Sequence, residues 1–484
     1  MRTAIIGGGI AGMAAAFELE KARAAGEDAA YTLFEARERL GGVLDSETVG
    51  GAVLERGPDS FLTEKPAAAE LCRELGLANA LTSSNDQERK TWIVARNRLV
   101  PLPDGLMFLI PTKLVPTALT RLFSVGTKMR MARELLLPPR TAHGDESVAA
   151  LVERHYGREA VERLADPLLS GIYGGDATQL SVRTVLPRLV EMEEIYGSLT
   201  RGMLAAHRQM RRRAAERARE VGAAGNRRQA PRGVFTTLRG GMRQLVEGLE
   251  ARLNPDSIRR GSPVSALRRI GEGWLVTSAG TTEEFDAIIL ASPAWASGAL
   301  LGGVDAALGE ELTAIPYSSS ITVNLVFDQS VLGPLPKGFG FLVPASEGRA
   351  MLACTFAHRK FPGRAPKGKA VLRVFLGGAR NETLLSATDE SLLATVRREL
   401  GEILGAAVMR QGAEPEAVRV ARWPRAMAQY AVGHQERLAR IHARLEALPG
   451  LRLAGNAYDG IGISDCIRLG RGAARELMEQ TVKA

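Results

Sequence analysis

The sequence has little cysteine, few aromatic residues and no long uncharged apolar run. Its three cysteines, Cys72, Cys354 and Cys466, are far apart and lack metal-ligand spacing, which argues against disulfides and against a zinc site or other metal centre. No run of about 18 apolar residues without charge is present to span a bilayer. With 45% hydrophobic residues in 484 positions, the composition indicates a globular protein of two or three domains.

Positive charge is concentrated in one segment. The net charge is +9, and residues 208–232 contain nine Arg against two Glu, or +7 of that total. The segment has almost no large apolar residues and no interleaved aromatics, and it trails into Gly, Asn and Pro. We therefore expect a solvated helix end and a basic flexible linker over residues 206–232, and no nucleic-acid partner.

The N-terminal stretch "TAIIGGGIAGMAAAFELEKARAAG" reads as a short strand, a glycine turn and an Ala-rich helix. Gly7, Gly9 and Gly12 form GxGxxG, in which the glycines permit a tight turn, close approach of a pyrophosphate and close helix packing. Glu35 ends the next apolar run, "YTLFEA", where a carboxylate accepts hydrogen bonds from a ribose 2′-OH. The early glycines and the lack of a cleavage site argue against a signal peptide, so a cytoplasmic protein is expected.

Two further glycine segments help to decide which dinucleotide, NAD or FAD, the chain binds. "ARERLGG" follows Glu35, so that the chain reads E-x-x-x-R-x-G-G, and "GNAYDGIGISDCIRLG" stands near the C-terminus. Both resemble flavoproteins of the monoamine oxidase and protoporphyrinogen oxidase group, in which the last strand and helix return to the nucleotide domain. The resemblance implies FAD held between glycine turns from opposite ends of the chain. Cys466 is expected to be a small buried residue and not a nucleophile.

Motifs along nearly the whole chain resemble one branch of that group. They are "ERGPDSFL" (55–62), "DPLLSGIYGGDATQLSVRTVLPRL" (166–189), "GFGFLVP" (338–344), "RWPRAMAQYAVGH" (422–434) and "LAGNAYDGIGISDCI" (453–467). In collinear order they are similar to the oxygen-dependent porphyrinogen oxidases of haem biosynthesis, which act on protoporphyrinogen IX or coproporphyrinogen III with FAD and O₂. Only the basic segment has no match.

The resemblance assigns FAD contacts residue by residue. The implied FAD is noncovalent, because no matched segment presents a flavin-linking Cys or His. Trp423 and Val264 are included only because of the motifs around them. The implied contacts are Gly7, Gly8, Gly9, Ile10, Ala11, Gly12, Glu35, Ala36, Gly41, Gly42, Gly57, Pro58, Asp59, Ser60, Val264, Trp423, Gly460, Ile461, Gly462 and Ile463.

A porphyrinogen is a broad apolar disc, so aliphatic and aromatic side chains are the expected lining of its pocket. The resemblance places Gly171, Leu342 and Phe356 there, although ordinary core strands explain the last two equally well. Many protoporphyrinogen oxidases carry an Arg where this chain has Thr91. A threonine cannot bind a propionate as a cation does, so nearby basic residues, Arg96 among them, are expected to do so. This favours coproporphyrinogen III, which has four propionates, over protoporphyrinogen IX, which has two.

The implied reaction removes six electrons and six protons from the macrocycle. A flavin accepts two electrons in each cycle, so three cycles are required, each with reoxidation by O₂ to H₂O₂. None of the six histidines falls in a matched cofactor or pocket position, and Asp59 is the one carboxylate nominated as a catalytic base. Positioning of the substrate is expected to supply most of the rate enhancement.

The expected fold is α/β, with a discontinuous Rossmann-like FAD-binding domain, an α+β substrate-binding domain with a mixed sheet, and a mainly helical domain. The FAD-binding domain is expected at 1–88, 233–298 and 418–484, the substrate-binding domain at 89–108 and 299–417, and the helical domain at 109–205. The apolar and basic residues of the helical segment suggest either a membrane surface contact or a cover for the pocket. A homodimer and handover of the product to ferrochelatase also stay open.

Three alternatives remain at this point. The chain could be a protoporphyrinogen IX oxidase proper, or another flavin enzyme of the same fold, such as an amine oxidase or carotenoid desaturase. An amine oxidase is expected to show an aromatic cage and often a flavin-linking Cys, and Cys466 lies in the wrong segment for that. A nonenzymatic porphyrin carrier that has kept the fold is a third option, and bound flavin would argue against it.

Overall fold

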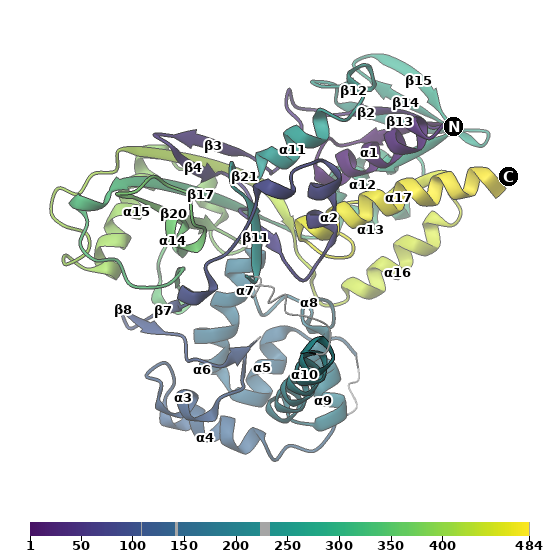
Figure 1. The fold of residues 1–484 in the computed structure, drawn as a ribbon. Helices are drawn as coiled ribbons and strands as arrows, with labels where there is room; N and C mark the ends of the chain where they lie inside the picture. Colours follow the sequence, from purple (N-terminus) through teal and green to yellow (C-terminus); the bar gives the residue numbers. More distant parts are fainter. Residues whose placement is uncertain (108, 141–143, 223–232, 484) are drawn as a thin grey trace.

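A computed structural model describes residues 1–107, 109–140, 144–222 and 233–483. The chain forms three lobes, seen in Figure 1 as a nucleotide lobe that carries both termini, a sheet lobe and a helical lobe. Segments from both ends of the chain build the nucleotide lobe. This arrangement confirms the predicted fold class.

The nucleotide lobe is built on a five-stranded sheet in the order β12-β2-β1-β16-β22, with every described pairing parallel. Helices α1 and α17 pack against each other on this sheet (Figure 1). Their close approach depends on Gly470, where an added Cβ would lie 2.0 Å from the Ala11 carbonyl oxygen. The elements are β1 (Arg2–Ile6), α1 (Ile10–Ala24), β2 (Ala30–Phe34), β12 (Ile258–Arg259), β16 (Ala287–Leu290), β22 (Leu451–Leu453) and α17 (Ile463–Lys483).

Smaller elements complete this lobe. An antiparallel sheet, β13-β14-β15, covers one side, and a second three-stranded sheet, β5-β11-β6, lies toward the other lobes. Helices α12 and α13 pack their leucines against the parallel sheet. The elements are β5 (Phe61–Leu62), α2 (Ala67–Glu74), β6 (Leu81–Ser83), β11 (Phe235–Leu238), α11 (Arg243–Glu250), β13 (Val264–Ile270), β14 (Gly273–Ser278), β15 (Thr281–Phe285), α12 (Ala294–Leu301), α13 (Ala306–Thr313) and α16 (His434–Leu445).

The sheet lobe is a seven-stranded mixed sheet in the order β21-β17-β20-β19-β18-β7-β8. Only β18 and β7 pair in parallel among these described strands. Apolar residues alternate along β17 and β20, and one set packs under α15, which leaves the other face toward the nucleotide lobe. The elements are β3 (Ser46–Val49), β4 (Ala52–Glu55), β7 (Thr91–Ala95), β8 (Arg98–Pro101), β17 (Tyr317–Asp328), β18 (Gly340–Leu342), β19 (Met351–Phe356), α14 (Ala357–Lys360), β20 (Lys369–Gly377), α15 (Asp389–Leu404) and β21 (Ala417–Ala428).

The helical lobe has its own apolar core. It lies below the other two in Figure 1. No helix within the described ranges is long and apolar enough to cross a membrane. Its elements are β9 (Leu106–Met107), β10 (Ile110–Pro111), α3 (Leu114–Leu119), α4 (Val125–Glu134), α5 (Val148–Tyr156), α6 (Arg158–Ala160), α7 (Asp166–Tyr173), α8 (Val182–Val185), α9 (Pro187–Tyr196) and α10 (Leu199–Gly222).

Three expected segment assignments need correction. Strand β21 pairs with β17 in the mixed sheet, so the segment that contains Trp423 belongs to the sheet lobe. Residues 299–313 form the end of α12 and α13 instead of substrate-sheet strands. The first part of the expected basic linker, residues 206–222, is a continuation of α10, because its Ala, Arg and Glu residues are good helix formers. Residues 223–232 lie outside the described residues.

Candidate cofactor and substrate site

Two glycine segments of the nucleotide lobe meet at the start of α1. No side chain caps α1, which begins at Ile10, so its first N–H groups are available to an anion. An added Cβ at Gly12 would lie 1.9 Å from the Gly7 carbonyl oxygen, whereas one at Gly9 would meet no atom within 4 Å. The Gly41 N–H donates to the Gly8 carbonyl at 2.8 Å. Gly12 thus serves packing, and Gly9 borders open space beside a helix N-terminus.

Glu35 lies at the end of β2, directly beside this turn. Its carboxylate accepts hydrogen bonds from the Gly8 N–H at 2.7 Å and from the Arg37 N–H at 2.9 Å. The Ser262 N–H donates to the Glu35 carbonyl at 2.9 Å, which brings the strand that begins at Val264 next to it. The structure therefore gathers the glycine turn, the acid and Val264 into one place.

The C-terminal glycine turn is held by tyrosine and aspartate side chains. The Tyr430 hydroxyl accepts from the Gly460 N–H at 2.9 Å and donates to the Asn456 carbonyl at 2.9 Å. Asp465, in the first turn of α17, accepts from the Gly462 N–H at 3.2 Å and pairs with Lys65 at 2.6 Å. Because α17 packs on α1, both glycine turns lie at one side of the parallel sheet.

Residues 55–60 form a third segment, whose carbonyl groups are bound by side chains from other elements. The Trp423 Nε1 donates to the Arg56 carbonyl at 2.7 Å, and the Arg373 guanidinium donates to the Gly57 carbonyl. The Asp59 carbonyl accepts from the Thr237 hydroxyl at 2.7 Å. Strands β20, β21 and β11 therefore fix the conformation of this loop.

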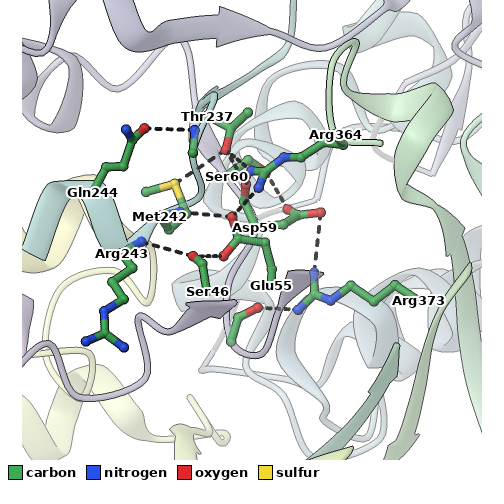
Figure 2. A network of polar contacts seen from close by, with 12 residues as sticks. Ser46, Glu55, Asp59, Ser60, Thr237, Met242, Arg243, Gln244, Arg364 and Arg373 are labelled. Carbon is green, nitrogen blue, oxygen red and sulfur yellow. Dashed lines mark hydrogen bonds and ion pairs between the residues drawn. The ribbon is translucent and has the colours of Figure 1, made fainter. Parts of the chain in front are cut away.

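The same loop carries buried charge, and Figure 2 shows the network. Glu55 pairs with Arg364 at 2.7 Å, and the side chains are 4% and 2% exposed. Its carboxylate also accepts from the Ser46 hydroxyl at 2.6 Å and the Met242 N–H at 2.9 Å. Burial raises the pKa of Glu55, and the Arg364 charge opposes that shift.

Asp59 is paired with two cations. Its carboxylate lies 2.9 Å from the Lys360 ammonium and 3.4 Å from the Arg373 guanidinium, and accepts from the Ser60 hydroxyl at 2.6 Å. Burial alone would raise the pKa of Asp59, but the charges of Lys360 and Arg373 outweigh it and hold the pKa below its usual range. An ionised carboxylate with so low a pKa is a weak proton acceptor, so this geometry favours a positioning role over the catalytic role expected for Asp59.

The substrate candidates do not all come together. An added Cβ at Gly171, in α7, would lie 3.1 Å from Leu342, so these two residues share the face of the sheet that meets the helical lobe. Phe356 is fully buried and packs edge-on against Phe341 in the core under α15. Adjacent strand residues point to opposite faces, which separates Phe356 from Leu342. Arg96 is exposed in the β7–β8 turn, where its N–H donates to Glu347 at 2.7 Å.

Sequence reasoning missed the cations that hold the 55–60 loop. Lys360, Arg364 and Arg373 belong to the sheet lobe and are far from the glycine motifs along the chain. One signal was available: Arg373 interrupts the apolar strand "AVLRVFLG". A buried arginine in such a strand requires a carboxylate or carbonyl partner. Its partners could not be identified without the pairing of distant segments.

The residues present fit a bound dinucleotide. Gly9 borders open space, α1 is uncapped, and the C-terminal turn adds a second helix start at Ile463. Cys466 is buried and free, and burial raises the pKa of its thiol to about 12, which makes it a poor nucleophile. Within the described residues no group of three or more potential ligands for a metal ion occurs.

The family model for flavin-containing amine oxidoreductases matches residues 10–478. The chain belongs to this family. It is 33% identical to the coproporphyrinogen III oxidase of Bacillus subtilis, over 98% of this chain and 97% of that protein. It is 28% identical to the chloroplastic protoporphyrinogen oxidase of Nicotiana tabacum, over 90% of this chain and 78% of that protein. These findings confirm the resemblance stated from the motifs.

This chain also matches a solved structure along nearly its whole length. A candidate protoporphyrinogen oxidase from Exiguobacterium sp. 255-15 superposes with a TM-score of 0.85 at 32% identity, over 99% of both chains. As a member of a flavin-containing family, the protein has a flavin cofactor. The glycine segments described above are the part of the chain suited to hold it.

Proposed function

We propose that this flavoprotein oxidises coproporphyrinogen III to coproporphyrin III, with FAD as the cofactor and O₂ as the electron acceptor. The observation that carries the proposal is the full-length similarity to relatives named coproporphyrinogen III oxidase. In the balanced reaction the macrocycle loses six hydrogen atoms and three O₂ molecules become three H₂O₂. The flavin, when bound, takes two electrons from the substrate in each of three cycles.

The residues of this chain would bind and position the two reactants. Gly9, Ile10 and Ile463 start the helices whose N–H groups suit phosphate, and Glu35 is placed to accept hydrogen bonds from a ribose. Asp59, held ionised by Lys360 and Arg373, would fix the 55–60 loop between cofactor and substrate. Gly171 and Leu342, which lie side by side, would contact one face of the macrocycle.

Protoporphyrinogen IX is the second candidate substrate, favoured by the tobacco relative. Thr91 pairs with Gly340 beside Leu342, so it lies near the proposed pocket and offers no cation to a propionate. Parallel measurements of kcat/KM for the two porphyrinogens test the assignment. We expect the value for coproporphyrinogen III to be at least equal, and a much higher value for protoporphyrinogen IX would contradict it.

Noncovalent binding of FAD is tested separately. Heat or acid denaturation is expected to release all the flavin into the supernatant, and FAD should be recovered intact. The variant Glu35→Gln is expected to retain less FAD, because the hydrogen bond from the ribose to the Glu35 carboxylate is charge-assisted and a neutral amide accepts it less strongly. Flavin that stays with the precipitated protein would contradict the proposal.

The helical lobe also carries a surface suited to anionic lipid. Between residues 112 and 140 the one acidic residue, Glu134, is buried, while Arg121, Arg130 and Arg133 are exposed. Exposed apolar side chains lie among them: Val115, Leu119, Val125, Met129 and Leu136. Such a combination favours peripheral contact with an anionic membrane surface. The variant Leu119→Glu should cosediment less with phosphatidylglycerol vesicles than wild type. If wild type is a dimer and Leu119→Glu is a monomer, the surface binds a second protein copy instead.

A further inference from the structure

Strand β21 contains an irregularity next to the candidate cofactor site. Along β17, Ser318 pairs with Met427 and Ser320 pairs with Trp423, so residues 424–426 stand opposite the single residue Ser319. A bulge of this kind redirects a side chain and is frequent beside functional sites. Its central residue, Arg425, has a φ of 47°, which is costly for a residue other than glycine.

Several contacts maintain this conformation. The Arg425 N–H donates to the Ser319 hydroxyl at 3.0 Å, and its carbonyl accepts from the Trp295 Nε1 at 3.3 Å. The guanidinium lies over the Trp295 ring, 4.4 Å from its centroid. Stacking on a ring leaves the N–H groups at the edge of the guanidinium plane available to a ligand.

The bulge is connected to the segments that fit the cofactor. On one side, Trp423 donates to the Arg56 carbonyl at 2.7 Å. On the other side, the Asn456 side chain of the C-terminal glycine turn donates to the Ala426 carbonyl at 2.9 Å. Trp295 is in the first turn of α12, which follows Ala291, and an added Cβ at Gly7 would lie 2.8 Å from the Ala291 carbonyl carbon. Arg425 is thus anchored among three candidate cofactor segments.

Its charge is not neutralised within the described part of the chain. The two other arginines of similar position in β21 have acidic partners: Arg419 pairs with Glu47 at 2.8 Å and Arg422 with Asp389 at 2.6 Å. Arg425 is exposed, and no carboxylate of the described residues lies within ion-pair distance of it. A strained, anchored and unpaired guanidinium is suited to an oxyanion supplied from outside the chain.

We propose that Arg425 binds an oxyanion, carboxylate or phosphate, of a molecule held at this site. Under the proposed function, on which this inference rests, the two sources are a propionate of the porphyrinogen and the pyrophosphate of FAD. The first would make Arg425 a determinant of substrate choice. The second would make it part of the cofactor site.

The experiment compares Arg425→Gln and Arg425→Lys with wild type, and uses Arg422→Gln as a control on the same strand that has an internal partner. FAD affinity is measured by titration of apoprotein, and kcat/KM is measured for coproporphyrinogen III and for its uncharged tetramethyl ester. A charge-assisted contact corresponds to a loss of about tenfold or more. We expect that loss in Arg425→Gln, a smaller one in Arg425→Lys and none in Arg422→Gln.

The pattern of losses identifies the source of the oxyanion. Weaker FAD binding by Arg425→Gln would identify the oxyanion as a phosphate of FAD. A lower kcat/KM for coproporphyrinogen III, with an unchanged value for the ester, would identify it as a propionate of the substrate. Arg425→Gly should bind as weakly as Arg425→Gln without a lower Tm, because glycine adopts positive φ without strain. If wild type oxidises no porphyrinogen, the proposed function fails, and the FAD titration alone then decides whether Arg425 binds an oxyanion. Values for Arg425→Gln within twofold of wild type in every measured arm would overturn the inference.

Discussion

Two clusters of largely buried charge in this protein differ in composition. The boundary cluster, between the nucleotide and sheet lobes, contains Glu55, Asp59, Lys360, Arg364 and Arg373, and its cations are lysine and arginine. The lobe cluster, in the helical lobe, contains Glu134, Arg154, His155 and Glu193. Only the second includes a cation that titrates near neutral pH.

The lobe cluster places a histidine between two carboxylates. His155 is 1% exposed and contacts Glu134 at 3.1 Å through Nδ1 and Glu193 at 3.2 Å through Nε2. Glu134 in turn accepts from Ser198 at 2.9 Å and from the Leu199 N–H at 2.5 Å, at the start of α10. Burial alone would lower the pKa of His155, but the hydrogen bonds to both carboxylates raise it above its ordinary value.

The cations in each cluster determine the pH range over which that cluster stabilises the fold. The boundary cluster supports the loop that fits the cofactor, and arginine and lysine keep their charge across the physiological range. The lobe cluster joins α4, α5 and α9 to the start of α10. Arg154 still holds Glu193 at alkaline pH, but the attraction of His155 for Glu134 and Glu193 depends on a protonated imidazole. The candidate site is therefore expected to be less sensitive to alkaline pH than the lobe that adjoins it.

Removal of Arg373 should have the largest effect. Arg373→Met leaves Asp59 with one cation fewer and removes the donor to the Gly57 carbonyl. Loss of one partner of a buried pair costs about 3–5 kcal/mol, so the free energy of unfolding should fall by that amount and FAD should be retained less well. Urea titration with flavin fluorescence measures both. Stability and FAD retention of Arg373→Met equal to those of wild type would contradict the pairing.

His155→Gln should cost about 3 kcal/mol near pH 6, because the buried Glu134 loses its charged partner and Glu193 keeps only Arg154. The folded pKa of His155 is raised from 6.5, so its contribution is complete below the unfolded pKa and is lost as pH rises through the folded value. Glu193, with a pKa lowered from 4.5 to about 2, loses its contribution as pH falls through that range. The lobe cluster is thus most stabilising between about pH 4.5 and 6.5.

The measurement is hydrogen exchange of α5 and α10 over a pH series. The difference in protection between wild type and His155→Gln should narrow from pH 6 to pH 9. Protection of the 55–60 segment should not follow the same curve. A difference that is constant with pH would show that His155 is buried as the neutral form.

Local patterns in the sequence were sufficient for the nucleotide lobe. The GxGxxG turn and the C-terminal glycines each combine a turn with a helix start within a short segment, and Glu35 directly ends a strand beside the first of them. The sheet lobe was harder, because Trp423 and Phe356 depend on which strand pairs with which. Trp423 was expected in the nucleotide domain, but β21 pairs with β17, and a strand sequence alone does not specify its partner.

The charged clusters were the least predictable part. Asp59 was nominated as a base from its motif, and its two cations come from residues about 300 positions away. The bulge at Arg425 was equally hidden, since "RWPRAMA" has no glycine to mark a positive φ. Contacts between distant segments fix such features, so they require the folded structure.

Lys360→Met tests whether the boundary cluster depends on one cation or two. Arg373 stays near Asp59 in this variant, so the cost should be smaller than in Arg373→Met, about 1.5 kcal/mol at pH 7. The pKa of Asp59 should rise toward its ordinary value of 3.8. Since a lowered carboxylate pKa stabilises the fold above the unfolded value, the difference from wild type should shrink below about pH 4. Acid unfolding curves of both proteins measure this, and parallel curves would contradict it.

The smallest effect is expected for an ion pair outside both clusters. Arg437, on α16, contacts Glu311 at 2.8 Å, and the two side chains are 28% and 21% exposed. Water screens pairs at such exposure, so Arg437→Gln should lower the free energy of unfolding by about 0.2–1 kcal/mol. The cost should fall further when NaCl is raised to about 1 M, where charges are screened within about 3 Å. The cost of Arg373→Met should change less with salt, because Arg373 is 5% exposed and Asp59 is 15% exposed. Equal salt dependence of the two variants would mean that the boundary cluster is more hydrated than its side-chain exposure indicates.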